Sequence, residues 1–172
     1  GIEQRKRISD AMGVVCALAD AGVRTGLRVC GPLPPAHVAL VRDWADGERV
    51  SDLVEVVGPI DDLATEYHRA IALLVPSAAE GFGLPAVEAM ACGTPVIAYA
   101  NSATSEVVAD GGILVPDRQV TEMAAAALRL ASDPAAWSEA SQRALERAKA
   151  FSWERCADIH AEVYRDVSAR TG

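Results

Sequence analysis

Five short apolar runs alternate with amphipathic stretches between residues 8 and 115, and this alternation constrains the fold most strongly. Strands are predicted at Leu27–Cys30, Leu53–Val57, Ile71–Val75, Pro95–Ala98 and Gly112–Val115. Helices are predicted at Ile8–Ala21, Pro35–Ala45, Asp62–Ala70, Pro85–Ala91 and Ser105–Ala109. The apolar runs lack strict alternation, as expected for strands that are buried on both faces. The pattern therefore predicts an α/β fold with a doubly wound parallel sheet flanked by helices.

The end of the chain follows a different pattern. After Pro116 and Asp117, helices alone are predicted, at Val120–Ala131, Pro134–Ala150 and Trp153–Ser168. A length of 172 residues suits one domain, so residues 1–172 are expected to form a single domain with a helical tail over 119–172. A parallel α/β domain usually begins with a strand, whereas Gly1–Arg5 resembles a loop entering a helix. We therefore expect the first strand to lie outside this chain.

Charge and composition argue against nucleic acid, a metal and a tightly bound cofactor as partners of the chain. The net charge of −8 argues against nucleic acid, which needs a basic surface. The histidines are scattered and no carboxylate cluster has ligand spacing, so we expect no metal and no tightly bound cofactor. Widely spaced cysteines among apolar neighbours predict small buried thiols in a reducing compartment, and hence a cytoplasmic protein: Cys16, Cys30, Cys92 and Cys156.

The chemistry is expected in the stretch after the third predicted strand. A glycine-bearing loop there leads into a helix that starts near Pro85, and a helix N-terminus attracts phosphate and hydroxyl oxygens. Gly81 and Gly83 would let the backbone approach a ligand closely. Glu80 and Glu88 frame the loop and, as ionised acceptors, would pair with sugar hydroxyls. By spacing alone, the ordinary interpretation is favoured, in which Glu80 is a partner of the helix dipole and Glu88 is a solvated helix residue.

The segment EGFGLPAVE, residues 80–88, resembles the Glu-x7-Glu signature of retaining glycosyltransferases with the GT-B fold, the group 1 (family 4) type. Three further segments also match the sequence pattern of that family: VPS at 75–77, EAMACGTPV at 88–96 and FSWE at 151–154. The resemblance implies that the chain is the C-terminal, Rossmann-like half of a GT-B fold. That half holds the donor, a nucleoside-diphosphate sugar, and faces an N-terminal domain across a cleft.

The resemblance also implies roles for the residues of the loop. Glu80 would bind hydroxyls of the transferred sugar, and Glu88 would hold the ribose of the nucleotide. Backbone N–H groups around Phe82, Gly83 and Leu84 would meet the sugar and the diphosphate, with Gly81 beside them. The Phe82 ring would either pack under the sugar or close over the loop as a structural lid.

Further donor contacts are implied elsewhere in the chain. The opening segment IEQRK, residues 2–6, resembles the family's IEPRK, in which the position of Lys6 neutralises the departing diphosphate and that of Arg5 lies beside it. Without the resemblance, the basic triplet Arg5–Arg7 would be a solvated helix entrance, and Arg7 is still expected at the surface. Pro59 and Ile60 match a loop that contacts the nucleobase, although a plain strand-to-helix turn is the alternative.

One segment departs from the family pattern. Residues 101–106 read NSATSE where many members have a phosphate-contacting loop written GGxPE. The loss of both glycines puts close backbone approach in doubt, and Glu106 alone matches. This departure leaves open a non-catalytic nucleotide-sugar-binding or assembly domain. Epimerisation or phosphorolysis on the same fold is a further alternative, but neither Lys6 nor Lys149 has the context of a Schiff base.

The predicted function is transfer of a sugar from a nucleoside-diphosphate donor to an acceptor, with retention at the anomeric carbon. The resemblance, rather than the residues themselves, supplies the stereochemistry. The acceptor is unknown, and its site is expected chiefly on the N-terminal domain, without which the chain should be inactive. Any peripheral association with a membrane would also run through that domain.

Overall fold

The computed structural model describes residues 5–48 and 50–171. The elements follow one another as α2 (Ile8–Asp20), β1 (Leu27–Cys30), α3 (Pro35–Gly47), η1 (Ser51–Leu53), β2 (Val54–Gly58), α4 (Leu63–Arg69), β3 (Leu73–Val75), α5 (Leu84–Ala91), β4 (Val96–Tyr99), α6 (Ser102–Val108), η2 (Ala109–Gly111), β5 (Ile113–Val115), α7 (Val120–Ser132), α8 (Pro134–Ala148) and α9 (Trp153–Thr171). The alternation of strands and helices up to β5 and the helical tail beyond it are as the sequence predicts.

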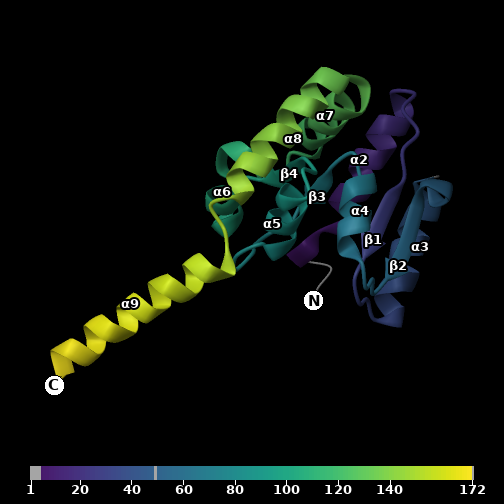
Figure 1. The fold of residues 1–172 in the computed structure, drawn as a ribbon. Helices are drawn as coiled ribbons and strands as arrows, with labels where there is room; N and C mark the ends of the chain where they lie inside the picture. Colours follow the sequence, from purple (N-terminus) through teal and green to yellow (C-terminus); the bar gives the residue numbers. More distant parts are fainter. Residues whose placement is uncertain (1–4, 49, 172) are drawn as a thin grey trace.

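The strands form two parallel sheets, one of β1 and β2 and one in the order β3-β4-β5 (Figure 1). Helices flank both sheets, which confirms the predicted α/β class. Within the part of the chain that the structure describes, no ladder joins β1 to β3. The described strands therefore form two separate sheets instead of one continuous sheet.

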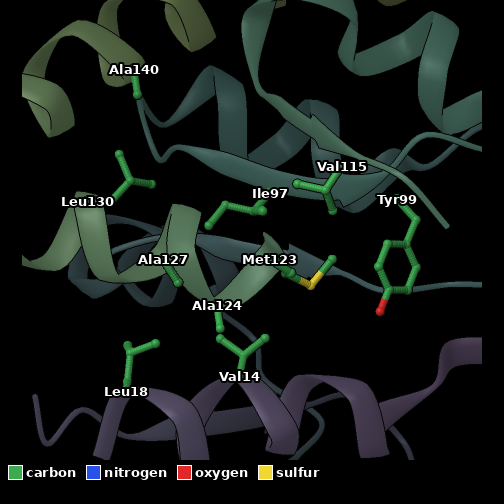
Figure 2. Packing of buried hydrophobic residues seen from close by; sticks show 10 residues of the cluster. All are labelled: Val14, Leu18, Ile97, Tyr99, Val115, Met123, Ala124, Ala127, Leu130 and Ala140. Atoms are coloured by element: carbon green, nitrogen blue, oxygen red, sulfur yellow. The ribbon is translucent and has the colours of Figure 1, made fainter. Parts of the chain in front are cut away.

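Strand β4 is the centre of the larger sheet and is buried over its whole length. Its side chains alternate between faces, as the pleat of a strand requires. Ile97 and Tyr99 belong to a cluster with residues of α2, α7 and β5 (Figure 2). Val96 and Ala98 belong to a second cluster with α5, α6 and α8. The prediction of a strand buried on both faces is confirmed for β4.

The same prediction is wrong for β1, in which half-buried and exposed residues alternate, and for β2, in which Glu55 is exposed and the other residues are half-buried. The apolar side chains Leu27 and Val54 pack against α2 and α3. The opposite face carries Arg28, which pairs with Glu55 on β2 and donates from Nε to Glu66 of α4 at 2.7 Å. These charges keep one face of the smaller sheet polar.

Helix α2 belongs to both halves of the molecule. Val14 and Leu18 pack in the cluster with α7 and β4, while Met12 packs with Val41 and Ala45 of α3. A helix that presents apolar residues to two neighbours is buried on most of its circumference. The two sheets are therefore joined by packing on α2 and by α4, which pairs with Arg28 of β1 and packs on α5, and no described ladder links them.

The three tail helices divide into two groups. Helix α7 packs on α2, and α8 packs on α5 and α7. Trp137 of α8 is part of this core, and its indole Nε1 donates to the Ile71 carbonyl at 2.8 Å. Helix α9 instead projects away from the body (Figure 1), and Trp153 at its start is 76% exposed. Among the described residues, no helix combines the length and the apolar character needed to cross a membrane.

Most predicted boundaries hold to within two residues, and their capping signals are confirmed. The Asp62 side chain accepts the Thr65 N–H at 3.1 Å, Pro85 lies in the first turn of α5, and Gly93 follows its end with φ +73°. The exceptions are α6, which begins at Ser102 instead of Ser105, and α9, which ends at Thr171 instead of Ser168. Ser102 enters α6 with φ +45°, a conformation that its residue type does not signal.

The expectation of buried thiols is wrong. All four cysteines are free, but Cys30 and Cys156 are exposed, and Cys16 and Cys92 are half-buried. Apolar sequence neighbours did not predict burial here because each neighbouring residue can face a different side of its helix or strand.

Gly112, at the start of β5, lies where a side chain cannot fit. A Cβ there would be 2.7 Å from the Val96 carbonyl oxygen and 2.5 Å from Val108 Cγ1. We expect Gly112→Ala to lower the free energy of unfolding by about 2 kcal/mol or more, because the backbone of β4 would have to move. Urea denaturation measures this loss.

The control is Gly47→Ala at the end of α3, where an added Cβ would have no neighbouring atom within 4 Å. This variant should be neutral or stabilising, because alanine favours a helix more than glycine does. Equal stability of both variants would contradict the close approach of Gly112 to β4.

Candidate functional site

The loop between β3 and α5 is tied to the residues that precede α2. The carboxylate of Glu80 accepts from Lys6 Nζ at 2.6 Å and from Arg5 Nη1 at 3.1 Å. The Ala78 N–H donates to the Arg5 carbonyl at 2.7 Å, so backbone and side chains both join the two segments. Two cations and one carboxylate thus meet at the carboxyl end of β3, the edge where open α/β sheets bind ligands.

Glu80 stays ionised in this setting. Its side chain is only 9% exposed, and burial by itself disfavours the charge. Hydrogen bonds from Lys6 and Ser77, with the charges of Lys6 and Arg5, oppose the effect of burial and hold the pKa of Glu80 below its usual range. At neutral pH the carboxylate is therefore an acceptor, with both oxygens oriented by cations.

Asn101 and Ser102 hold the other side of the loop. Ser102 Oγ accepts the Glu80 N–H at 3.0 Å, and Asn101 Nδ2 donates to the Ser77 carbonyl at 3.0 Å. The sequence departs from glycine in this segment, yet Ser102 still adopts the left-handed φ that favours glycine. The side chains of Asn101 and Ser102 make the contacts with the loop, and the family motif gives no sign of them.

Arg7 is a structural anchor, so the expectation that it would be a surface residue is wrong. Its side chain is 14% exposed, and Nη1 donates to Asp117 Oδ1 at 2.7 Å. Asn101 donates to the same oxygen at 2.8 Å, and the guanidinium lies 5.7 Å from the Tyr99 ring centroid. The hydrogen bond from Arg7 is the main cause that lowers the pKa of Asp117. Asp117 follows β5 and Asn101 follows β4, so both lie at the carboxyl edge of the same sheet. A polar residue soon after a predicted strand is the sequence signal that could have found them.

The start of α2 has a second anchor inside the core. Tyr99 is fully buried, and its hydroxyl donates to Asp10 Oδ2 at 2.8 Å. Figure 2 shows the Tyr99 hydroxyl directed toward α2. Arg7 itself has φ +47°, and its carbonyl accepts the Asp10 N–H at 3.0 Å. These contacts fix the direction in which Lys6 enters the site.

Glu88 lies on α5 and is exposed. Oε2 of its carboxylate accepts from the Tyr67 hydroxyl of α4 at 3.0 Å. Burial, this hydrogen bond and the Glu88 charge raise the pKa of Tyr67 above its ordinary value, so the phenol remains a donor. Glu80 and Glu88 therefore belong to separate hydrogen-bonded groups at the two ends of the loop and helix start.

The residues between them form the entry to α5. Gly83 is its N-cap with φ +98°, and Gly81 and Leu84 are exposed. The Phe82 ring stacks edge-on against Phe151, with centroids 5.8 Å apart, and remains 44% exposed. The structure thus supports the lid role for Phe82 by tying the loop to the segment that follows α8.

The remaining candidates are farther along the edge. Gly58, with φ +81°, leads into exposed Pro59 and half-buried Ile60, and the Gly58 carbonyl accepts the Gly31 N–H at 2.7 Å. Glu106 is exposed on α6, and its carboxylate makes no hydrogen bond to another candidate among the described residues. The start of the IEQRK segment, residues 2–4, lies outside the described residues.

Residues 2–133 match the profile of a family described as "Glycosyl transferases group 1". The chain belongs to the group 1 glycosyltransferases. The chain is similar to a D-inositol 3-phosphate glycosyltransferase of Kribbella flavida, with 39% identity over 139 residues that cover 78% of this chain and 32% of that protein. This group 1 glycosyltransferase chain spans about a third of the length of the curated relatives it matches.

Solved structures agree with the family. Sucrose-phosphate synthase from Thermosynechococcus elongatus, at 32% identity, superposes with a TM-score of 0.84 over 96% of this chain and 44% of that one. Anabaena HepE in complex with UDP gives a TM-score of 0.78 at 21% identity, over 96% and 47% of the two chains. The predictions of the group 1 family and of a GT-B-type fold are confirmed.

The cations around Glu80 make its titration testable. Lys6→Met should raise the pKa of Glu80, because it removes a hydrogen bond and a charge that favour ionisation. Since the folded pKa of Glu80 is depressed, its contribution to stability is present above the unfolded value of about 4.3. That contribution is lost as the pH falls through the folded pKa, and Lys6→Met should move the loss to higher pH. Carboxyl NMR titration measures the pKa.

The control is Lys149→Met, which removes the other lysine, an exposed partner of Glu146 at the end of α8. It should leave the titration of Glu80 unchanged. An unaltered Glu80 pKa in Lys6→Met would show that this ion pair does not govern the carboxylate.

Proposed function

We propose that this chain is the donor-binding half of a retaining glycosyltransferase, which moves a sugar from a nucleoside diphosphate to an acceptor. The observation that carries the proposal is the convergence of Lys6 and Arg5 on Glu80 at the carboxyl end of β3. Glu88, eight positions further along the sequence, provides a second carboxylate at the same loop-helix unit. An activated sugar has hydroxyls on its sugar and on its ribose, which suit the two carboxylates. The diphosphate that joins the sugar and the ribose suits the two cations.

The nucleoside diphosphate is supported by chemistry and by likeness. Glu80 and Glu88 are acceptors for hydroxyl donors, and Lys6 and Arg5 are donors for phosphate oxygens. The N-terminus of α5 adds backbone N–H groups between the carboxylates, behind Gly81 and Gly83. A structurally similar protein, HepE, was solved in complex with UDP.

In the proposed reaction, the bond between the anomeric carbon and the diphosphate oxygen breaks while the acceptor oxygen bonds to the same face of the sugar, and the acceptor's hydroxyl proton passes to the departing diphosphate. Negative charge grows on the departing diphosphate, and Lys6 with Arg5 would stabilise it by an amount on the order of a few kcal/mol. Glu80 would orient the sugar through its hydroxyls, and no described carboxylate pair is assigned as nucleophile and acid. Positioning and charge stabilisation then carry the acceleration.

The acceptor is assigned to an N-terminal domain that faces this one. The chain covers about a third of its curated relatives, so there is room in such proteins for a second domain. Helix α9 extends from the body with Ile159 and Val163 exposed on it, which suits packing against another domain. Transfer is therefore expected of the two-domain enzyme and not of this chain alone.

The division of labour between the carboxylates can be tested by calorimetric titration of the two-domain enzyme. The ligands are UDP, GDP and ADP and the corresponding nucleotide sugars. Glu88→Ala should weaken the affinity for the free nucleotide about 10- to 100-fold, as for a lost hydrogen bond to a charged group. Glu80→Ala should impair binding of the sugar nucleotide and leave the free nucleotide nearly unchanged.

Glu139→Ala, which removes an exposed carboxylate paired with Arg143 on α8, is the matched control and should change neither affinity. Equal losses for nucleotide and sugar nucleotide in both site variants would reject the division of labour. Unchanged affinities in both would reject the proposed function.

A further inference from the structure

Glu88 binds a ligand more favourably when its carboxylate is already held in one orientation. It is exposed on α5, and a free Glu side chain loses considerable rotamer entropy when a ligand fixes it. The Tyr67 hydroxyl donates to Oε2 at 3.0 Å, and among residues 5–48 and 50–171 the structure gives the Glu88 carboxylate no other hydrogen bond. One oxygen is thus occupied and the other remains available as an acceptor.

Tyr67 is itself firmly held. Its carbonyl accepts the Thr94 hydroxyl at 2.7 Å and the Ala70 N–H at 3.0 Å, and Thr94 is 2% exposed. Its ring packs against the cluster that contains Ala89 and Met90 of α5. The hydroxyl therefore extends from a fixed backbone and a packed ring toward the next helix, so it is a rigid support for a flexible partner.

The direction of the hydrogen bond is also fixed. An ionised carboxylate can only accept, and the phenol keeps its proton because its pKa lies above the ordinary value. A ribose offers two adjacent hydroxyl donors, which suit the remaining carboxylate oxygen. A deoxyribose lacks one of these donors.

We propose that Tyr67 is a positioning residue that orients Glu88 for the ribose diol, so that this pair sets the preference of the site for ribonucleotides over deoxyribonucleotides. The inference rests on the proposed function, in which Glu88 holds the ribose. Tyr67 acts through Glu88 and needs no contact with the ligand. Its contribution is to fix the carboxylate before the nucleotide arrives.

The test uses Tyr67→Phe, which removes the hydroxyl and keeps the ring. Dissociation constants are measured in the two-domain enzyme for whichever of UDP, GDP and ADP binds most tightly, and for its 2′-deoxy and 3′-deoxy analogues. Tyr67→Phe should weaken the ribonucleotide about 10-fold, the lower range for a hydrogen bond to a charged group. At least one deoxy analogue should lose much less, so the ratio of affinities falls.

A double-mutant cycle separates positioning from general damage. Glu88→Gln should lower the same ratio, and adding Tyr67→Phe to it should cause little further loss, because both act through one contact. Tyr164→Phe removes the hydroxyl of an exposed tyrosine on α9 and should change nothing. Tyr67→Met, an apolar side chain without the hydroxyl, gives the same test if the phenylalanine variant does not fold.

The outcomes distinguish the inference from the function on which it rests. If Glu88→Gln lowers the ratio but Tyr67→Phe does not, or if the two losses add, the positioning role is overturned. If Glu88→Gln leaves the ratio intact, the assignment of Glu88 to the ribose fails first, and the inference fails with it.

Discussion

The ion pairs between Glu80 and the two cations Arg5 and Lys6 are the contact on which the site depends. They join residues far apart in the sequence, one group before α2 and the other after β3. Because Glu80 is nearly buried, a carboxylate without these partners would favour its neutral form. The same contact therefore fixes the loop, keeps the acid ionised and holds the cations where a diphosphate would need them.

Around this contact, the parallel sheet brings separate strand ends to one edge. Ser77 follows β3, Asn101 follows β4 and Asp117 follows β5, and hydrogen bonds connect all three. Arg7 joins them from the start of α2 through Asp117. The polar residues at this edge thus form one hydrogen-bonded network that joins three strand ends to the start of α2.

The sequence predicted the α/β alternation and the helical tail because these depend on local periodicity, and it predicted the group 1 family from one distinctive motif. It did not predict the polar face of β1, because Glu66, the partner of Arg28, lies in α4, and only the folded chain brings the two together. The pairings of Arg7 and Tyr67 were missed for the same reason. Their partners, Asp117 and Glu88, lie in other elements, and pairing of that kind leaves no spacing to recognise. Ser102 adopts a backbone conformation that residue type alone would argue against.

The position of α2 between the two sheets has a mechanical consequence. The segment that enters it carries Arg5 and Lys6, one apolar face packs on α7 and β4, and another packs on α3 and β1. No described strand pairing links the sheets, which are joined by packing on α2 and by the contacts of α4 with β1 and α5. A tilt of α2 would therefore change the spacing between the turn at Gly58 and Glu80. In the proposed site these two points meet opposite ends of one donor, so residues inside α2 that touch no ligand would influence its fit.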